Sequence, residues 1–209
     1  LITILFANDL LTSEQRHRSI VRSSPLSPWH AINTKTLTVL TALAGVLLLS
    51  ALVVAGFVIP THGVGSLTTA IAYFAKDGMT VTVDPIALSI ALPIILGLTI
   101  LLMWLFIRLN LLCQLLFHNE LVGLVLSALL LFGEPLYFMH GLAFSVPQTA
   151  YYLPGYMNPA AIVSGLQNFR YDTSRMSPLA ALIVVGSVII VLEVILFIIT
   201  HRRRAAIVK

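Results

Sequence analysis

The sequence predicts an all-α polytopic membrane protein, and three observations support this fold class. Hydrophobic residues make up 58% of the 209 residues, charged residues make up 10%, and the mean hydropathy is +0.99. A soluble domain carries about 25% charged residues. Uncharged apolar runs recur along the chain, and a helix needs about 20 such residues to cross a membrane. This composition excludes a disordered chain, a nucleic-acid-binding module and a conventional cytosolic enzyme.

Four complete transmembrane helices account for the apolar runs. We expect these spans at residues 36–60, 85–109, 120–139 and 178–200. The second is expected to begin at Pro85, because a proline fits the first turn of a helix, and to end at Arg108, whose side chain can extend to the lipid head groups. Pro93 inside this span predicts a kink. Asn119 is expected to cap the start of the third span.

The segments between the spans differ in composition. Residues 1–8 resemble the end of a further span whose beginning is missing. Residues 61–84 are expected to form a short exposed loop, in which Lys76, Asp77 and Gly78 make a turn-like group between segments of moderate β propensity. Residues 140–177 contain several prolines, and five of the six tyrosines lie between Tyr137 and Tyr171. Because prolines interrupt helices and tyrosines favour the membrane interface, we expect short helices here that re-enter the membrane or lie on one face.

Lysine and arginine are distributed unevenly between the two expected faces of the membrane. If the spans alternate in direction, nine of the twelve fall on the face that holds residues 9–35 and the tail, residues 201–209. The positive-inside rule assigns this face to the cytoplasm. We therefore expect both termini to be cytoplasmic and residues 140–177 to be external, in the plasma membrane of a bacterium.

The cytoplasmic segment at residues 9–35 is the first candidate for a functional contact. Thr12 and Gln15 form a capping box, Glu14 and Arg22 suit the two ends of a helix dipole, and Pro25 would end the helix. One interpretation is a charged helix that only sets topology or contacts anionic lipid. The other is a docking surface for a cytosolic protein. The candidate residues of that surface are Glu14, Gln15, Arg16, Arg18, Arg22 and Pro25.

Two acidic residues within the predicted spans are the second candidate. An ionised group at the centre of a spanning helix costs about 2.5–3.5 kcal/mol on insertion scales, so Glu193 should face protein or a water-filled path. Glu193 is either a structural carboxyl group bonded to a neighbouring span or part of a substrate path. Glu134 precedes Pro135 near the outer end of the third span, where a helix-break or interface role is favoured over substrate contact.

Motifs for other chemistry do not occur in the sequence. There is no G-x-x-x-x-G-K-[ST] phosphate-binding loop, no H-E-x-x-H zinc motif and no G-x-S-x-G nucleophile motif. The single cysteine, Cys113, excludes an internal disulfide. We therefore expect no catalytic residue, metal ion or cofactor in this chain, and no nucleic acid as a partner.

The order of these elements resembles the membrane subunit of the type-2 family of ATP-binding cassette exporters. The resemblance rests on the charged helix with its Pro-Leu-Ser turn, SEQRHRSIVRSSPLS, just before a span, on three further spans, and on the segment YYLPGYMNPAAIVSGLQ before the last span. It covers nearly the whole chain, without the family's first span and most of its second.

This resemblance implies a permease that forms a translocation path. The helix at residues 12–27 would couple it to a separate cytosolic ATPase, which binds ATP and Mg²⁺, and a second permease subunit would complete the path. Two other interpretations stay open: a non-transporting membrane immunity or scaffold protein, and a proton-coupled carrier that uses Glu193. The substrate could be a peptide, a drug, a lipid-linked sugar or a lipid.

Overall fold

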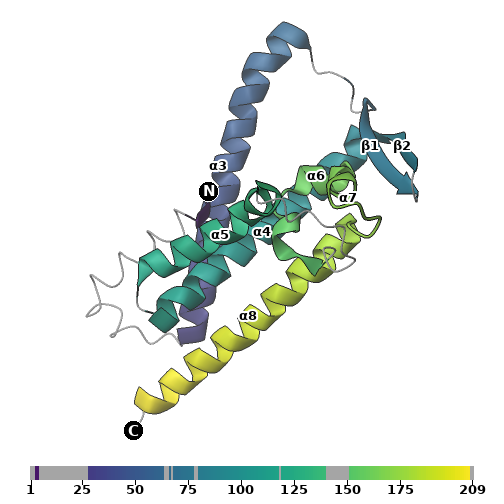
Figure 1. Ribbon diagram of the computed structural model, residues 1–209. Coiled ribbons are helices and arrows are strands. Elements are labelled where there is room, and N and C mark those ends of the chain that lie inside the picture. The colour runs from purple at the N-terminus through teal and green to yellow at the C-terminus, as the bar shows by residue number, and fades with distance from the viewer. Residues whose placement is uncertain are drawn as a thin grey trace. The chain divides into compact units, whose positions relative to one another are not determined.

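The structure is a computed structural model, and it describes residues 3–4, 28–63, 66, 68–77, 80–117, 119–139 and 151–207. Within these ranges the chain is mostly helical, with one two-stranded hairpin (Figure 1). The predicted docking helix, including Glu14, Gln15, Arg16, Arg18, Arg22 and Pro25, lies outside the described residues, as do residues 140–150.

Three helices in the described part of the chain are long and apolar enough to cross a membrane. They are α3 (Pro28–His62), α4 (Leu88–Phe117) and α8 (Pro178–Ile207). A shorter apolar helix, α5, covers Glu120–Met139. Its bounds are those predicted for the third span, and the predicted cap is confirmed: the backbone N–H of Leu121 donates to Oδ1 of Asn119 over 3.0 Å.

The predicted loop at residues 61–84 and the start of the second span were wrong. Strands β1 (Ala70–Asp77) and β2 (Thr80–Ala87) pair in an antiparallel hairpin, with Tyr73 opposite Asp84. Pro85 therefore lies in a strand, which is tolerated because both strands of a two-stranded sheet are edges. Helix α4 begins only at Leu88.

Helix α4 continues past Arg108 to Phe117, so the helix does not end where we expected the second span to end. Helix α3 begins at Pro28, before the expected first span, and includes residues that were expected in the cytoplasmic segment. Likewise, α8 continues to Ile207, beyond the expected end at residue 200. Each helix therefore extends past the apolar run that identified it.

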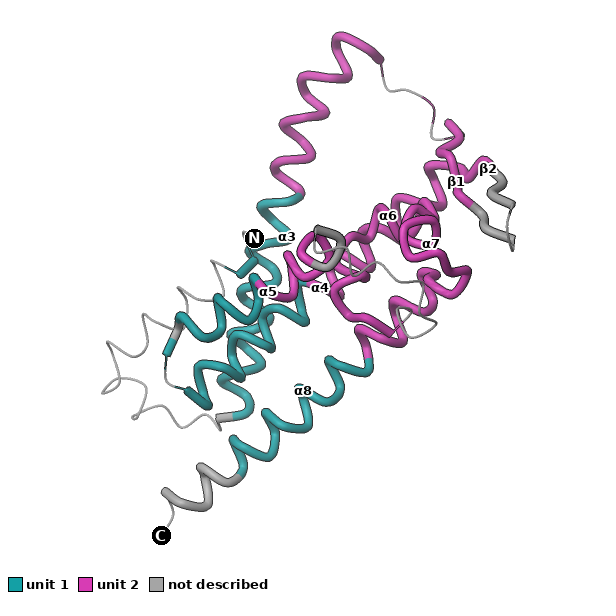
Figure 2. Tube along the Cα trace, viewed as in Figure 1, with its two compact units in different colours: residues 1–47, 103–128, 187–209 teal, residues 48–102, 129–186 magenta. Residues whose placement is uncertain are grey.

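The chain forms two compact units, which Figure 2 shows in different colours. Unit 1 comprises residues 1–47, 103–128 and 187–209, and unit 2 comprises residues 48–102 and 129–186. The core of unit 1 is an apolar seam between α3 and α4. It consists of Ile32, Val39, Leu43, Met103, Ile107 and Leu111.

Helices α4 and α5 approach closely within unit 1. Asn110 is fully buried, and its Nδ2 donates to the backbone oxygen of Phe106 over 2.8 Å and to Oγ of Ser127 over 3.0 Å. Gly123 faces Asn110: a Cβ atom at Gly123 would lie 2.6 Å from Oδ1 of Asn110. A small residue here lets the two backbones come together, as is common between spanning helices.

Unit 2 contains the hairpin and a series of short helices. These are the 3-10 helix η2 (Leu153–Tyr156), α6 (Pro159–Val163) and α7 (Leu166–Arg170). The expectation of several short helices is thus confirmed for the described residues from 151 on; their relation to the membrane was not tested. The hairpin joins this series because the N–H of Phe74 donates to the backbone oxygen of Ser164 over 2.9 Å.

A tight turn between α6 and α7 makes that contact possible. Gly165 has a φ of +71°, in the left-handed region that only glycine adopts without strain. A Cβ atom at this position would collide with the backbone oxygen of Phe74. Gly165 therefore allows both the turn and the close approach of β1.

Many side chains of the long helices face outward without covering protein. On α3, Leu48, Phe57 and their neighbours are exposed, Phe57 to 75%. Soluble proteins rarely expose a continuous apolar patch of this length. Lipid hydrocarbon is the environment that such a helix fits, in agreement with the membrane character that its composition predicts.

Candidate functional site

A buried ion pair in unit 1 joins α4 to α8. Nε of Arg108 lies 2.7 Å from Oε1 of Glu193, and the side chains are 3% and 25% exposed, respectively. Arg108 is the only charged residue within α4, and Glu193 is the only one among residues 178–200. Each charge in these two spans is therefore neutralised by the other, which lowers the cost of burying both.

Three further residues surround this pair. Nη2 of Arg108 donates to Oδ1 of Asn33, on α3, over 2.6 Å. Nε1 of Trp104 donates to Oε1 of Glu193 over 3.0 Å. The guanidinium carbon of Arg108 also lies 5.1 Å from the ring centre of Trp104 and 5.9 Å from that of Trp29. We call Trp29, Asn33, Trp104, Arg108 and Glu193 the unit 1 cluster.

The unit 1 cluster fixes three helices to one another through directed bonds. Apolar contacts alone would specify this arrangement weakly, because lipid tails are as apolar as the helix surfaces. Asn33 lies near the start of α3, directly after the segment predicted to dock a cytosolic protein. Asn33 therefore connects the first turns of α3 to Arg108 on α4.

A second charged group lies in unit 2 at the end of α5. Oε1 of Glu134 accepts from Nε2 of Gln167 over 2.9 Å and from Nη1 of Arg170 over 3.0 Å. The side chain of Glu134 is 8% exposed, whereas that of Arg170 is 46% exposed. Gln167 is fully buried and donates also to the backbone oxygen of Gly155, so it holds the carboxylate in place from the protein side.

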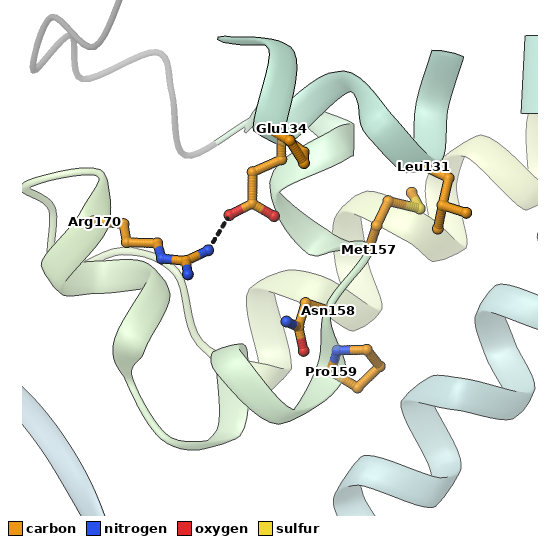
Figure 3. Close-up of a pocket in the computed structure, with 7 residues that line it drawn as sticks. Leu131, Glu134, Met157, Asn158, Pro159 and Arg170 are labelled. Atoms are coloured by element: carbon orange, nitrogen blue, oxygen red, sulfur yellow. Dashed lines mark hydrogen bonds and ion pairs between the residues drawn. The ribbon is translucent and has the colours of Figure 1, made fainter. Parts of the chain in front are cut away.

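A pocket of about 700 Å³ opens beside Glu134. Figure 3 shows Glu134 and Arg170 on one side of it and Leu131 with Met157 on the other. The volume is within the range of about 300–1,000 Å³ that is usual for small-molecule sites. The residues that line it are Leu131, Glu134, Pro135, Met157, Asn158, Pro159 and Arg170.

Unit 2 also buries side chains of η2 and of the segment after α7. Tyr156 is 1% exposed and Met176 is fully buried. Burial, together with the neighbouring phenol of Tyr151, raises the pKa of the Tyr156 hydroxyl. The N–H of Met176 donates to Oδ1 of Asn168 over 2.9 Å, which fixes the chain before α8 begins. The elements that carry Met157 and Arg170 are therefore packed against buried side chains.

The predictions for the two acidic residues met different outcomes. Glu193 is bonded to a neighbouring span, as one of its two interpretations stated, and its partner Arg108 had been assigned to the head-group region instead. Glu134 bonds Gln167 and Arg170 rather than only breaking a helix, since α5 continues past Pro135 to Met139. Among the described residues, no three His, Cys, Asp or Glu side chains are placed to hold a metal ion.

Sequence reasoning missed Asn33, Trp104, Gln167 and Arg170. A signal for Arg108 was present, because a lone cation in one span and a lone anion in another invite pairing. No comparable signal identified Gln167, whose contacts depend on how η2 and α7 fold.

Comparisons with protein families, curated proteins and solved structures found no match to this chain.

Proposed function

We propose that this chain is the permease subunit of an ATP-driven exporter of the type-2 ATP-binding cassette family. In this proposal its helices form part of the translocation path, a second permease subunit completes the path, and a separate cytosolic ATPase supplies the energy. The observation that carries the proposal is the order of elements. Long apolar helices are followed by the short helices η2, α6 and α7, the first two with a proline in the first turn, and these precede the last long helix, α8.

The unit 1 cluster suggests how nucleotide binding would be transmitted. The predicted coupling segment, residues 12–27, leads directly into α3, and Asn33 of α3 bonds Arg108. A ligand shifts a conformational equilibrium only through its different affinities for the two states. The ATPase must therefore bind residues 12–27 differently with and without ATP. The hydrogen bond between Asn33 and Arg108, and the ion pair between Arg108 and Glu193, would carry that difference to α4 and α8.

Affinity purification of the full chain from its native membrane tests this proposal. We expect a protein with a phosphate-binding loop to co-purify in a fixed ratio and to hydrolyse ATP. The double variant Arg18→Glu/Arg22→Glu reverses two charges of the expected docking surface, so that protein should no longer co-purify with it. The matched control is Arg175→Glu, an exposed cation of unit 2. Unchanged co-purification in the double variant would contradict the proposed coupling.

The two other interpretations give different results in the same preparation. A proton-coupled carrier should lose uptake driven by a pH gradient in Glu193→Gln and should require no ATPase. An immunity or scaffold protein should purify with its partner but without any protein that carries a phosphate-binding loop.

A further inference from the structure

One carboxylate oxygen in the unit 2 pocket is left without a donor. Gln167 and Arg170 both bond Oε1 of Glu134, and within the described part of the chain Oε2 accepts no hydrogen bond. Figure 3 shows this oxygen turned away from Arg170, towards the side of the pocket that carries Met157 and Asn158. Because the residue is only 6% exposed, water reaches this oxygen mainly through the pocket. A ligand that donates hydrogen bonds would complete the coordination of the carboxylate.

The neighbouring groups are donors and suit an anion. Arg170 is nearly half exposed, so its guanidinium is accessible to a ligand while it bonds Glu134. Oδ1 of Asn158 accepts from the N–H of Ala161 over 3.2 Å, which leaves its Nδ2 for another partner. In Figure 3 this nitrogen lies on the side of the pocket that carries Arg170.

These charges select a zwitterion over a simple ion. An anion alone would draw Arg170 away and leave the buried Glu134 carboxylate uncompensated, which is unfavourable. A cation alone would compete with Arg170 for the same carboxylate. A molecule with both an ammonium group and a phosphate group satisfies Glu134 through the first and Arg170 with Asn158 through the second.

The other walls of the pocket are apolar. Leu131, Met157 and Pro159 line it. Helix α5, which carries Leu131, also exposes the apolar side chains of Phe132 and Leu136. A ligand with a hydrocarbon part would therefore find an apolar surface that leads away from the charged end. This arrangement fits an amphiphile whose head group carries the two charges.

We propose that the pocket beside Glu134 and Arg170 binds a phosphoethanolamine group, as in the head group of phosphatidylethanolamine or in a water-soluble phosphoethanolamine ester. A primary ammonium group is specified because it can donate hydrogen bonds to Oε2 of Glu134, whereas the trimethylammonium group of choline cannot. Binding here requires neither an ATPase nor transport. Its failure would therefore leave the proposed exporter function untouched, and the reverse also holds.

Native mass spectrometry of the purified full chain in detergent tests the site. The probes are phosphatidylethanolamine, phosphatidylcholine with the same acyl chains, and glycerophosphoethanolamine. We expect phosphatidylethanolamine to bind at least about tenfold more tightly than phosphatidylcholine, the usual effect of one charge-assisted hydrogen bond. Tighter binding of the lipid than of glycerophosphoethanolamine supports a membrane head group. Equal binding of these two supports the same site with a soluble ester as the ligand.

Variants separate this site from adventitious lipid binding. Glu134→Gln should abolish the preference for ethanolamine, and Met157→Trp should reduce binding by filling the pocket without changing a charge. The control is Arg175→Gln, an exposed cation of unit 2 that does not line the pocket, and it should bind like the unmodified chain. Equal binding of ethanolamine and choline lipids would overturn the proposal, as would undiminished binding of phosphatidylethanolamine in Met157→Trp when that variant has the normal thermal unfolding midpoint.

Discussion

Replacing Glu193 by methionine should destabilise unit 1 more than replacing Arg108 by methionine. Glu193→Met leaves the guanidinium of Arg108, 3% exposed, without its anion. Removing one partner of a buried ion pair costs about 3–5 kcal/mol. Because Glu193 itself is 25% exposed, we expect the lower end, about 3 kcal/mol, which is about a 100-fold change in the unfolding equilibrium. Arg108→Met leaves a carboxylate that keeps solvent contact and the N–H of Trp104, so its effect should be smaller.

The double variant distinguishes an ion pair from two independent contributions. Two methionines of similar volume remove both charges at once, and such replacements are often neutral or stabilising. We therefore expect the double variant to be more stable than Glu193→Met alone. If the two single effects simply add, to within about 0.5 kcal/mol, the proposed pairing is refuted.

Tryptophan fluorescence during thermal unfolding in detergent is a suitable assay. The chain has two tryptophans, Trp29 and Trp104, and both rings lie beside Arg108, so their emission reports on the unit 1 cluster. The control is Ile190→Met, on an outward face of α8, where the side chain is 65% exposed. It should unfold at the same temperature as the unmodified chain.

Three further predictions follow from close contacts and burial. Gly165→Ala should destabilise unit 2 by more than about 1 kcal/mol, because position 165 has a positive φ and the added Cβ atom would collide with β1. Hydrogen exchange should then increase in residues 70–77. The control Gly45→Ala places its Cβ atom in open space and should have no such effect. Gly123→Ala should lower the unfolding midpoint by the equivalent of about 1–3 kcal/mol, and adding Asn110→Ala should restore part of it. Exposed phenols ionise near pH 10, and in a titration followed by phenolate absorbance Tyr156→Phe should remove the component that ionises later. Because the folded-state pKa of Tyr156 is raised, stability should be unaffected below about pH 10 and should decrease as the pH rises towards that pKa.

The sequence predicted the elements that depend on composition and local signals. Long apolar runs identified α3, α4 and α8, the polar group at Asn119 identified the start of α5, and prolines identified the break-up of the chain before α8. Pro178 is at the start of α8 as expected, and Oγ of Ser177 accepts from the N–H of Ala180 over 3.1 Å to cap it. These signals act within a few residues of the feature that they determine.

The features that sequence reasoning missed depend on partners far along the chain. Pro85 suits a helix start and an edge strand equally well, and only pairing with residues 70–77 decides between them. Arg108 suits a head-group position until Glu193, on another helix, is placed beside it. The unit 2 pocket requires α5, η2 and α7 to meet. The sequence positions of Glu134, Gln167 and Arg170 give no sign that these three side chains contact one another.

Labelling of single cysteines from each side of sealed vesicles tests the central claim, a four-span permease with cytoplasmic termini. With Cys113 replaced by alanine, the positions are Ser19→Cys before α3, Ser66→Cys between α3 and α4, and Ser174→Cys between α5 and α8. We predict that an impermeant maleimide labels positions 66 and 174 from the external side and position 19 from the cytoplasmic side. Labelling of positions 66 and 174 from opposite sides would show that α5 does not cross the membrane and would contradict the four-span topology.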